Sequence, residues 1–209
     1  MKRVNQPSQV VPLLDVGLSL SGIGLTGFVL LHLGLLASVL LGAQSMNSLA
    51  SFLERFYLLQ GGAPLLILLA IAHVFLAARK APITYRERLA LIQQIRRLGH
   101  FDTWSWGFQA LSGAILLAIG SVHLLVILTD LPIQAAKSGE RVFGIYLWFY
   151  LPFIFFVETH SSLGLYRIAV KWGLVPRRWA HRGLILASVA AITIGLAILS
   201  TLYVLGSKQ

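Results

Sequence analysis

Four histidines lie inside long apolar stretches of the chain, where an ionisable side chain is unusual. They are His32, His73, His123 and His160. A neutral imidazole can offer one ring nitrogen to a metal while its other N–H bonds a nearby acceptor. Because placing such a group in hydrocarbon is costly, its presence points to a function. The residue type and its repetition therefore predict metal ligands.

The composition is that of a membrane protein. Of the 209 residues, 57% are hydrophobic and only 11% are charged, against about 25% charged in soluble domains. The absence of cysteine excludes disulfides, thiolate haem ligands and iron–sulfur ligands on this chain. A net charge of +10 would suggest nucleic acid in a soluble protein. Here it indicates basic loops at one membrane face, with the lipid bilayer and no nucleic acid as partner.

The apolar runs predict an all-α fold, a single transmembrane domain over residues 1–209 with five helices. The first run is too long for a cleaved signal peptide, so we expect it to be a retained anchor. We place the helices at about 16–41, 62–80, 103–128, 142–170 and 183–204. We expect the links between them to be loops, two of them polar and two basic.

The basic residues predict the orientation of this bundle. Thirteen Lys and Arg residues, Lys2 and Arg3 among them, belong to one set of helix ends, and four belong to the other. Cytoplasmic ends carry the excess of Lys and Arg. We therefore expect a cytoplasmic N-terminus and, after five spans, a C-terminus outside.

The depths of the histidines sort them into two layers. His73 and His160 each lie seven residues before the basic ends of their helices, about 10 Å from the inner boundary. His123 and His32 lie about 10 and 15 Å from the outer boundary. Each pair could ligate one haem iron from both faces. The alternative is that each histidine only makes hydrogen bonds between helices, but two depth-matched pairs favour haem.

The chain contains the stretches AHVFLAARKAPITYRERL, GHFDTWSWGFQALSG, GSVHL and VETHSSLGLYRIAVKWG, three of which contain one of these histidines. With these stretches the chain resembles a known family, the five-helix dihaem cytochrome b subunit of menaquinone-linked fumarate reductases and succinate dehydrogenases, from about Leu18 to about Gly183. The resemblance implies two haem b groups. His73 and His160 would ligate the iron of the haem proximal to the soluble subunits, and His32 and His123 that of the distal haem.

The resemblance also implies partners and a location. A flavoprotein subunit with FAD and an iron–sulfur subunit would bind on the cytoplasmic side, and the dicarboxylate chemistry would belong to the flavoprotein. This chain would be a multi-pass protein of a bacterial cytoplasmic (inner) membrane. It would pass electrons between the iron–sulfur subunit and a menaquinone/menaquinol site, for succinate oxidation or fumarate reduction, in a complex compatible with a dimer.

Four further side chains are candidates for binding haem propionates. Trp106 and Lys171 resemble the family's contacts to the proximal propionates. Arg141 and Tyr150 could serve the distal haem. The alternatives are that Lys171 and Arg141 extend to the membrane surface and that Trp106 is an interfacial anchor.

Two carboxylates are candidates for proton chemistry. Glu54 occupies the place of the family's quinone-site glutamate; the alternative is an ordinary surface carboxylate paired with Arg55. Glu158 lies two residues before His160, and the resembling glutamate is proposed to pass protons across the membrane. The alternative is a protonated, hydrogen-bonded structural glutamate.

Two other functions would use similar residues. One is another transmembrane b-type cytochrome, of the quinone or ferric reductase type, which shares the paired histidines but not the quoted stretches. The other is a proton-coupled transporter, which predicts broken helices or repeats that the sequence lacks. Haem content separates the transporter, and copurifying flavoprotein and iron–sulfur subunits separate the other cytochrome.

Overall fold

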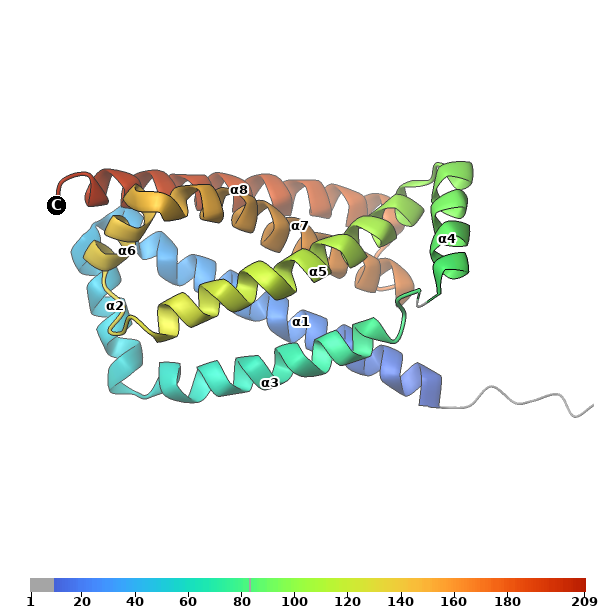
Figure 1. Cartoon of the computed structure of the whole chain (residues 1–209), viewed down its shortest axis with the longest axis horizontal. Helices are drawn as coiled ribbons and strands as arrows, with labels where there is room; N and C mark the ends of the chain where they lie inside the picture. The colour runs from blue at the N-terminus through green and yellow to red at the C-terminus, as the bar shows by residue number, and fades with distance from the viewer. Residues whose placement is uncertain (1–9, 83) are drawn as a thin grey trace, which may run out of the picture.

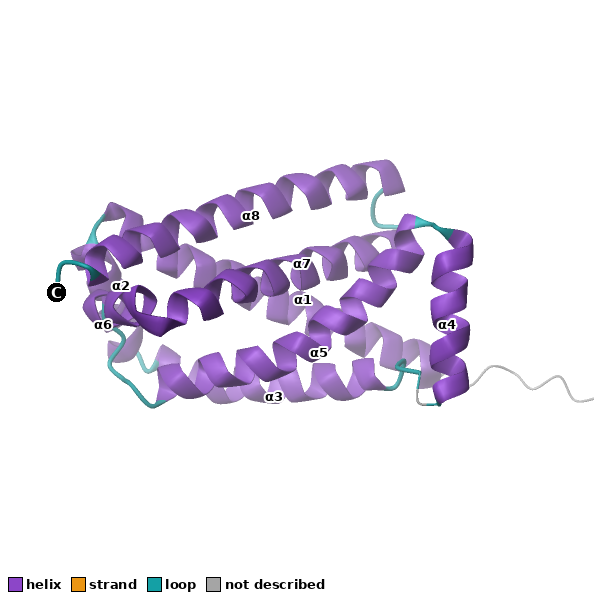
Figure 2. Ribbon diagram, turned by 45° about the horizontal axis from the view of Figure 1, so that its top comes forward, coloured by secondary structure: helices purple, strands orange, loops and turns teal. Residues whose placement is uncertain are grey.

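Long helices running along one axis make up this protein (Figures 1 and 2). The computed structural model describes residues 10–82 and 84–209, and this part of the chain contains no strand. Its elements are α1 (Val10–Ala37), the 3₁₀ turn η1 (Ser38–Leu41), α2 (Ala43–Arg55), α3 (Leu58–Ala78), α4 (Tyr85–Leu98), α5 (Phe101–Leu128), α6 (Ala135–Arg141), the π-helical turn η2 (Val142–Tyr146), α7 (Leu147–Lys171) and α8 (Arg177–Gly206). Lys2 and Arg3, used above for orientation, lie outside the described residues.

Among the described residues, five helical stretches are long and apolar enough to cross a membrane. They are Pro12–Leu41, Gln60–Ala78, Phe101–Leu128, Ala135–Lys171 and Arg177–Gly206. The expected five-helix, all-α architecture is confirmed. Several bounds were wrong. The fourth stretch begins seven residues before the expected start at 142, and the fifth begins six residues before the expected start at 183. Hydropathy marks the part of a helix that lies in hydrocarbon, whereas the helix itself continues into the polar interface.

Two links expected to be loops are helical. Following the predicted orientation, we call the end of the bundle that carries α4 the inner end and the opposite end the outer end (Figure 1). A capping box starts α4: the Glu87 backbone N–H donates to Thr84 Oγ1 at 3.2 Å, and the Thr84 N–H donates to Glu87 Oε2 at 3.0 Å. Gly99, with φ +56°, ends it.

The outer link is also helical, because α2 is amphipathic and finds partners across the bundle. Its buried Met46 joins a core formed with α6 and α8. The Ala135 N–H donates to Asn47 Oδ1 at 2.8 Å, which attaches α2 to the start of α6. The link expected to be a polar loop is therefore the helix α2, which packs across the outer end of the bundle.

The fourth stretch bends before it crosses the bundle. Gly144, inside η2, has ψ −142° and breaks the helical geometry between α6 and α7. The bend lays α6 against α8 so closely that a Cβ on Gly206 would collide with the carbonyl oxygen of Gly139. Only glycines permit this contact, which fixes the outer end of α8.

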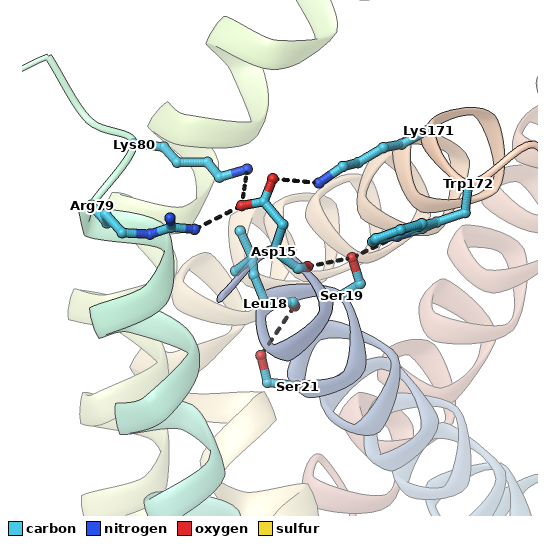
Figure 3. A network of polar contacts seen from close by, with 8 residues as sticks. All are labelled: Asp15, Leu18, Ser19, Ser21, Arg79, Lys80, Lys171 and Trp172. Carbon is cyan, nitrogen blue, oxygen red and sulfur yellow. Dashed lines mark hydrogen bonds and ion pairs between the residues drawn. The ribbon is translucent and has the colours of Figure 1, made fainter. Parts of the chain in front are cut away.

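One carboxylate ties three helices together at the inner end (Figure 3). Asp15 of α1 accepts from Arg79 Nη2 at 2.7 Å, from Lys80 Nζ at 2.9 Å and from Lys171 Nζ at 2.7 Å. The cations come from the ends of α3 and α7. The sequence analysis placed Asp15 only at a helix start and did not foresee this cluster.

Candidate haem sites

The inner pair of histidines comes together from α3 and α7. The ring centres of His73 and His160 lie 6.5 Å apart, and the ring planes are nearly perpendicular at 83°. Two metal–imidazole bonds of about 2 Å, with roughly 1 Å from each ring centre to its nitrogen, put two axial imidazoles about 6 Å apart. The separation therefore suits one metal ion bound between the rings.

Two serine hydroxyls lie within hydrogen-bond distance of the Nδ1 atoms of the inner histidines. Ser21 Oγ lies 3.0 Å from His73 Nδ1, and Ser112 Oγ lies 3.1 Å from His160 Nδ1. Each hydroxyl donates its own proton to a backbone carbonyl, at 3.0 and 3.2 Å. The serine oxygens can therefore accept from Nδ1–H groups, and in that tautomer each Nε2 carries the lone pair that would bind a metal. The sequence analysis missed both serines.

Glycines allow the neighbouring helices to approach this pair. A Cβ on Gly22 would lie 3.3 Å from His73 Cε1, and one on Gly113 would lie 3.0 Å from His160 Cε1. These distances are at or below ordinary contact, so larger residues would displace the rings. Glycine at these two positions therefore leaves the rings their present places.

Gln109 of α5 is a further polar side chain at the inner pair. Its Nε2 donates to the carbonyl oxygen of His160 at 3.0 Å and lies 3.5 Å from the Nε2 of the same ring. Its Oε1 is buried and has no hydrogen-bond partner within the described chain. The sequence analysis missed Gln109, although an amide inside an apolar run, three residues before Ser112, was a usable signal.

The outer pair comes together from α1 and α5. The ring centres of His32 and His123 lie 6.2 Å apart at an interplanar angle of 70°, and Phe28 stacks on His32 at 5.6 Å. His123 Nδ1 is buried and has no partner among the residues described. The spacing again suits a metal between the rings, but none of the described serines bonds a ring of this pair as Ser21 and Ser112 do in the inner one.

Arg141 and Tyr150 lie beside the outer pair. The Tyr150 ring centre is 5.8 Å from that of His123, and Arg141 lies next to the Tyr150 hydroxyl. Arg141 Nη2 bonds Asp130 at 2.9 Å, while its buried Nε lacks a partner in the described structure. The hydrogen bond from Lys137, together with the charge of Arg141, lowers the pKa of Asp130 below its usual value. An unpartnered guanidinium nitrogen here fits a propionate carboxylate.

The donor set suits haem better than a bare metal ion. Within the described residues, no group of three or more His, Cys, Asp or Glu side chains could hold a metal. Each histidine pair supplies two ligands, so the remaining ligands must come from elsewhere. A porphyrin supplies four equatorial nitrogens and leaves two axial positions for imidazole. The residues present therefore fit two bis-histidine haems.

The two proposed proximal propionate contacts lie on different helices, Lys171 at the end of α7 and Trp106 in α5. Lys171 is bound to Asp15 in the inner cluster, although that carboxylate serves three cations and leaves positive charge in excess. Trp106 is half-buried on α5. The structure thus gives Lys171 a carboxylate partner that the sequence analysis did not name.

The two candidate carboxylates differ in environment. Glu158 is buried in α7, with 5% of its surface exposed; its Oε1 accepts from Ser162 Oγ at 2.6 Å, and its Oε2 has no partner in the described region. Glu54 is half-buried at the end of α2, where its Oε1 accepts from the Ile133 N–H at 3.3 Å. Glu158 therefore shares a helix with His160, whereas Glu54 belongs to the outer end.

Comparison with known proteins identifies the family. Residues 84–199 match the succinate dehydrogenase/fumarate reductase transmembrane subunit family. The chain belongs to this family. It is 36% identical over 171 residues to a fumarate reductase cytochrome b subunit of Helicobacter pylori, an alignment that covers 77% of this chain and 67% of the relative. A fumarate reductase cytochrome b subunit of Wolinella succinogenes is 36% identical over 170 residues, covering 77% and 66%.

Membership in the transmembrane subunit family confirms the resemblance drawn from the sequence. It agrees with the five apolar helices, and the relatives are bacterial proteins, as expected for a multi-pass protein of a bacterial membrane. The family match includes His123, Glu158 and His160 but begins after His32 and His73. The geometry of the two pairs is therefore an independent reason to connect all four histidines.

Proposed function

We propose that this chain is the dihaem cytochrome b subunit of a fumarate reductase or succinate dehydrogenase complex, passing electrons between a menaquinone site and an iron–sulfur subunit. The observation that carries the proposal is the pairing of four histidines at ring-centre separations of 6.5 and 6.2 Å. Relatives named as fumarate reductase cytochrome b subunits support it.

The paired imidazoles would hold the iron of two haems. His73 and His160 would hold the inner haem, His32 and His123 the outer one. Bound haem supplies reversible one-electron transfer. Ser21 and Ser112 keep the inner rings in the tautomer with Nε2 free, and Arg141 with Tyr150 would bind outer propionates. Lys171 and Trp106 would bind the inner propionates from the edge of the bundle.

Glu54 is our candidate for the acid–base group of the quinone site. Oxidation of menaquinol releases protons, and reduction of menaquinone takes them up, so the site needs a group that exchanges protons. The Ile133 N–H holds one carboxylate oxygen of Glu54 and leaves the other available. Its place at the outer end suits a quinone that enters from the membrane.

Glu158 is our candidate for proton transfer across the membrane. The Ser162 hydroxyl holds Oε1, while the buried Oε2 lies without a partner among the described residues. A buried carboxyl group with one free oxygen can accept a proton from one side and release it to the other. Such transfer would offset the voltage that transmembrane electron transfer generates.

The soluble partners would dock at the inner end. We assign this end to the cytoplasm because it carries most of the Lys and Arg residues. There α4 lies across the bundle and presents Arg86, Arg96 and Arg97 on an exposed helix (Figure 1). An FAD-bearing flavoprotein and an iron–sulfur subunit are the partners that this arrangement would serve.

Haem stoichiometry on the purified membrane protein tests the proposal. A reduced-minus-oxidised spectrum should show two b-type haems per chain, with flavoprotein and iron–sulfur subunits copurifying. One haem would mean that one histidine pair is misassigned. A folded protein without haem would contradict electron transfer and favour a proton-coupled transporter, whereas haem without those subunits would favour another membrane cytochrome.

A further inference from the structure

Two adjoining pockets at the inner end have no role in the proposed electron transfer. One, of about 540 Å³, is lined by aromatic rings and by charged side chains: His100, Phe101, Asp102, Tyr166, Arg177, Arg178 and His181. The second, of about 300 Å³, shares His181 with it and continues between α5, α7 and α8. Together they form one groove, with charged side chains at one end, which we call its polar half, and mainly apolar side chains at the other, its apolar half.

In the polar half of the groove, the described residues leave one arginine without a carboxylate partner. Asp102 accepts from the Tyr166 hydroxyl at 2.6 Å and also bonds Arg177, so its carboxylate is already occupied. Arg178 has no carboxylate partner in the part of the chain that the structure describes; it lies 5.9 Å from the Trp179 ring. The free charge at this mouth is therefore positive.

The apolar half lies at the depth of lipid chains. Its wall includes Leu184, Ile185 and Val189 of α8. Arg182, whose guanidinium lies 5.0 Å from the centre of the Trp179 ring, marks the membrane interface. Val189 lies seven residues further along α8, about 10 Å deeper. A ligand of this groove must therefore combine an anionic head with a hydrocarbon chain.

We propose that the groove binds an anionic phospholipid, with its phosphate at Arg178 and His181 and one acyl chain between α5 and α8. Arginine pairs favourably with phosphate oxygens, and basic pockets between transmembrane helices bind anionic head groups. A neutral quinone ring would leave the cation without a counterion. An acidic protein segment would not account for the apolar continuation at hydrocarbon depth.

Lipid titration of the intact, delipidated complex in detergent tests the head-group contact. Native mass spectrometry should show dioleoylphosphatidylglycerol binding in preference to dioleoylphosphatidylcholine. Arg178→Gln should weaken binding of the anionic lipid about tenfold, because it removes one charge-assisted contact to the phosphate. Arg182→Gln, which removes the same charge from the same helix outside the pocket wall, should change it less than about twofold.

Equal losses in both variants would overturn the proposal and leave only diffuse charge attraction. Equal binding of the two lipids would overturn it by showing no preference for an anionic head group. A second pair of variants tests the acyl groove. Ser188→Phe would fill the groove and should weaken anionic-lipid binding about tenfold, whereas Leu186→Phe, at a side chain outside the groove, should not. Undiminished binding in Ser188→Phe would exclude this path for the chain.

Discussion

His73 and His160 face each other across the inner half of the bundle with their ring centres 6.5 Å apart. They come from α3 and α7. Each lies seven residues before the basic residues at the end of its helix, and this equal spacing predicts that both rings lie at one depth. His32 and His123 form a second pair at 6.2 Å. The pairs that the depth estimate predicts are thus the pairs that the fold brings together.

Double variants test this pairing more sharply than single ones. Each of the four single His→Ala variants should lose one haem, because one imidazole cannot hold an iron that needs two. His73→Ala with His160→Ala should still retain one haem per chain. His73→Ala with His123→Ala should retain none. Pyridine haemochrome spectra of purified protein measure the count.

The exposed His100 provides the control, since His100→Ala removes an imidazole outside both pairs and should leave two haems. If the His73/His160 double variant lost both haems while remaining folded, the assignment of these residues to one iron would be wrong. The assignment would also be wrong if the variant with both His73→Ala and His123→Ala kept one haem.

Ser112→Ala should change the inner haem without removing it. The Ser112 oxygen accepts from the Nδ1–H of His160 at 3.1 Å, which makes the ring a stronger donor to iron. Loss of this acceptor should raise the reduction potential of one haem and weaken its binding about tenfold. A redox titration followed optically measures both haems at once.

Ser121→Ala is the matched control for this serine. Ser121 lies on the same helix, and its hydroxyl donates to the Leu117 carbonyl instead of bonding a histidine ring. It should leave both potentials unchanged. A Ser112→Ala protein with two unshifted potentials would show that the serine does not act on the ligand.

Gly113→Ala should displace His160. A Cβ at this position would lie 3.0 Å from His160 Cε1, closer than ordinary contacts allow. The ring must move or the helices must separate, at a cost of about 1–3 kcal/mol. We expect partial loss of one haem and a lower melting temperature. Gly183→Ala, where nothing lies within 4 Å of the added Cβ, should have neither effect.

The five helices were predictable from the sequence because each carries an apolar run long enough to span hydrocarbon. Their ends were not, because hydropathy does not register the turns that continue past the membrane boundary. The helix α4 was missed for a different reason: it is amphipathic and too polar on average to stand out by hydropathy. The Thr84–Glu87 capping box and the helical spacing of Leu91, Ile95 and Leu98 were nevertheless signals in the sequence.

The residues that support the ligands were harder to predict than the ligands. Depth along a helix places His73 and His160 at one level, but it does not give the rotation of α1 or α5 about its axis. Rotation decides that Ser21 and Ser112 point at the rings. The same limit hid the contacts of Asp15, whose three cations come from two other helices.

Glu54→Gln should stop reaction with quinol and leave the rest of the chain intact. An amide cannot exchange the protons that menaquinol oxidation releases, so quinol-dependent turnover should fall at least about 100-fold. Fumarate reduction by an artificial dye donor should be unaffected, and both haems should remain. Glu140→Gln, at another outer carboxylate, should retain quinol activity. Unchanged quinol activity in Glu54→Gln would remove Glu54 from the quinone site.

Glu158→Gln separates proton transfer from structure. Glutamine keeps the shape of the side chain and can still bond Ser162, so both haems and the fold should persist. If Glu158 carries protons that offset the voltage of electron transfer, the variant should turn over slowly in sealed vesicles. An ionophore that collapses the voltage should restore the rate, as should solubilisation in detergent. Normal turnover in sealed, coupled vesicles would show that the buried carboxyl group of Glu158, with its unpartnered Oε2, serves the structure alone.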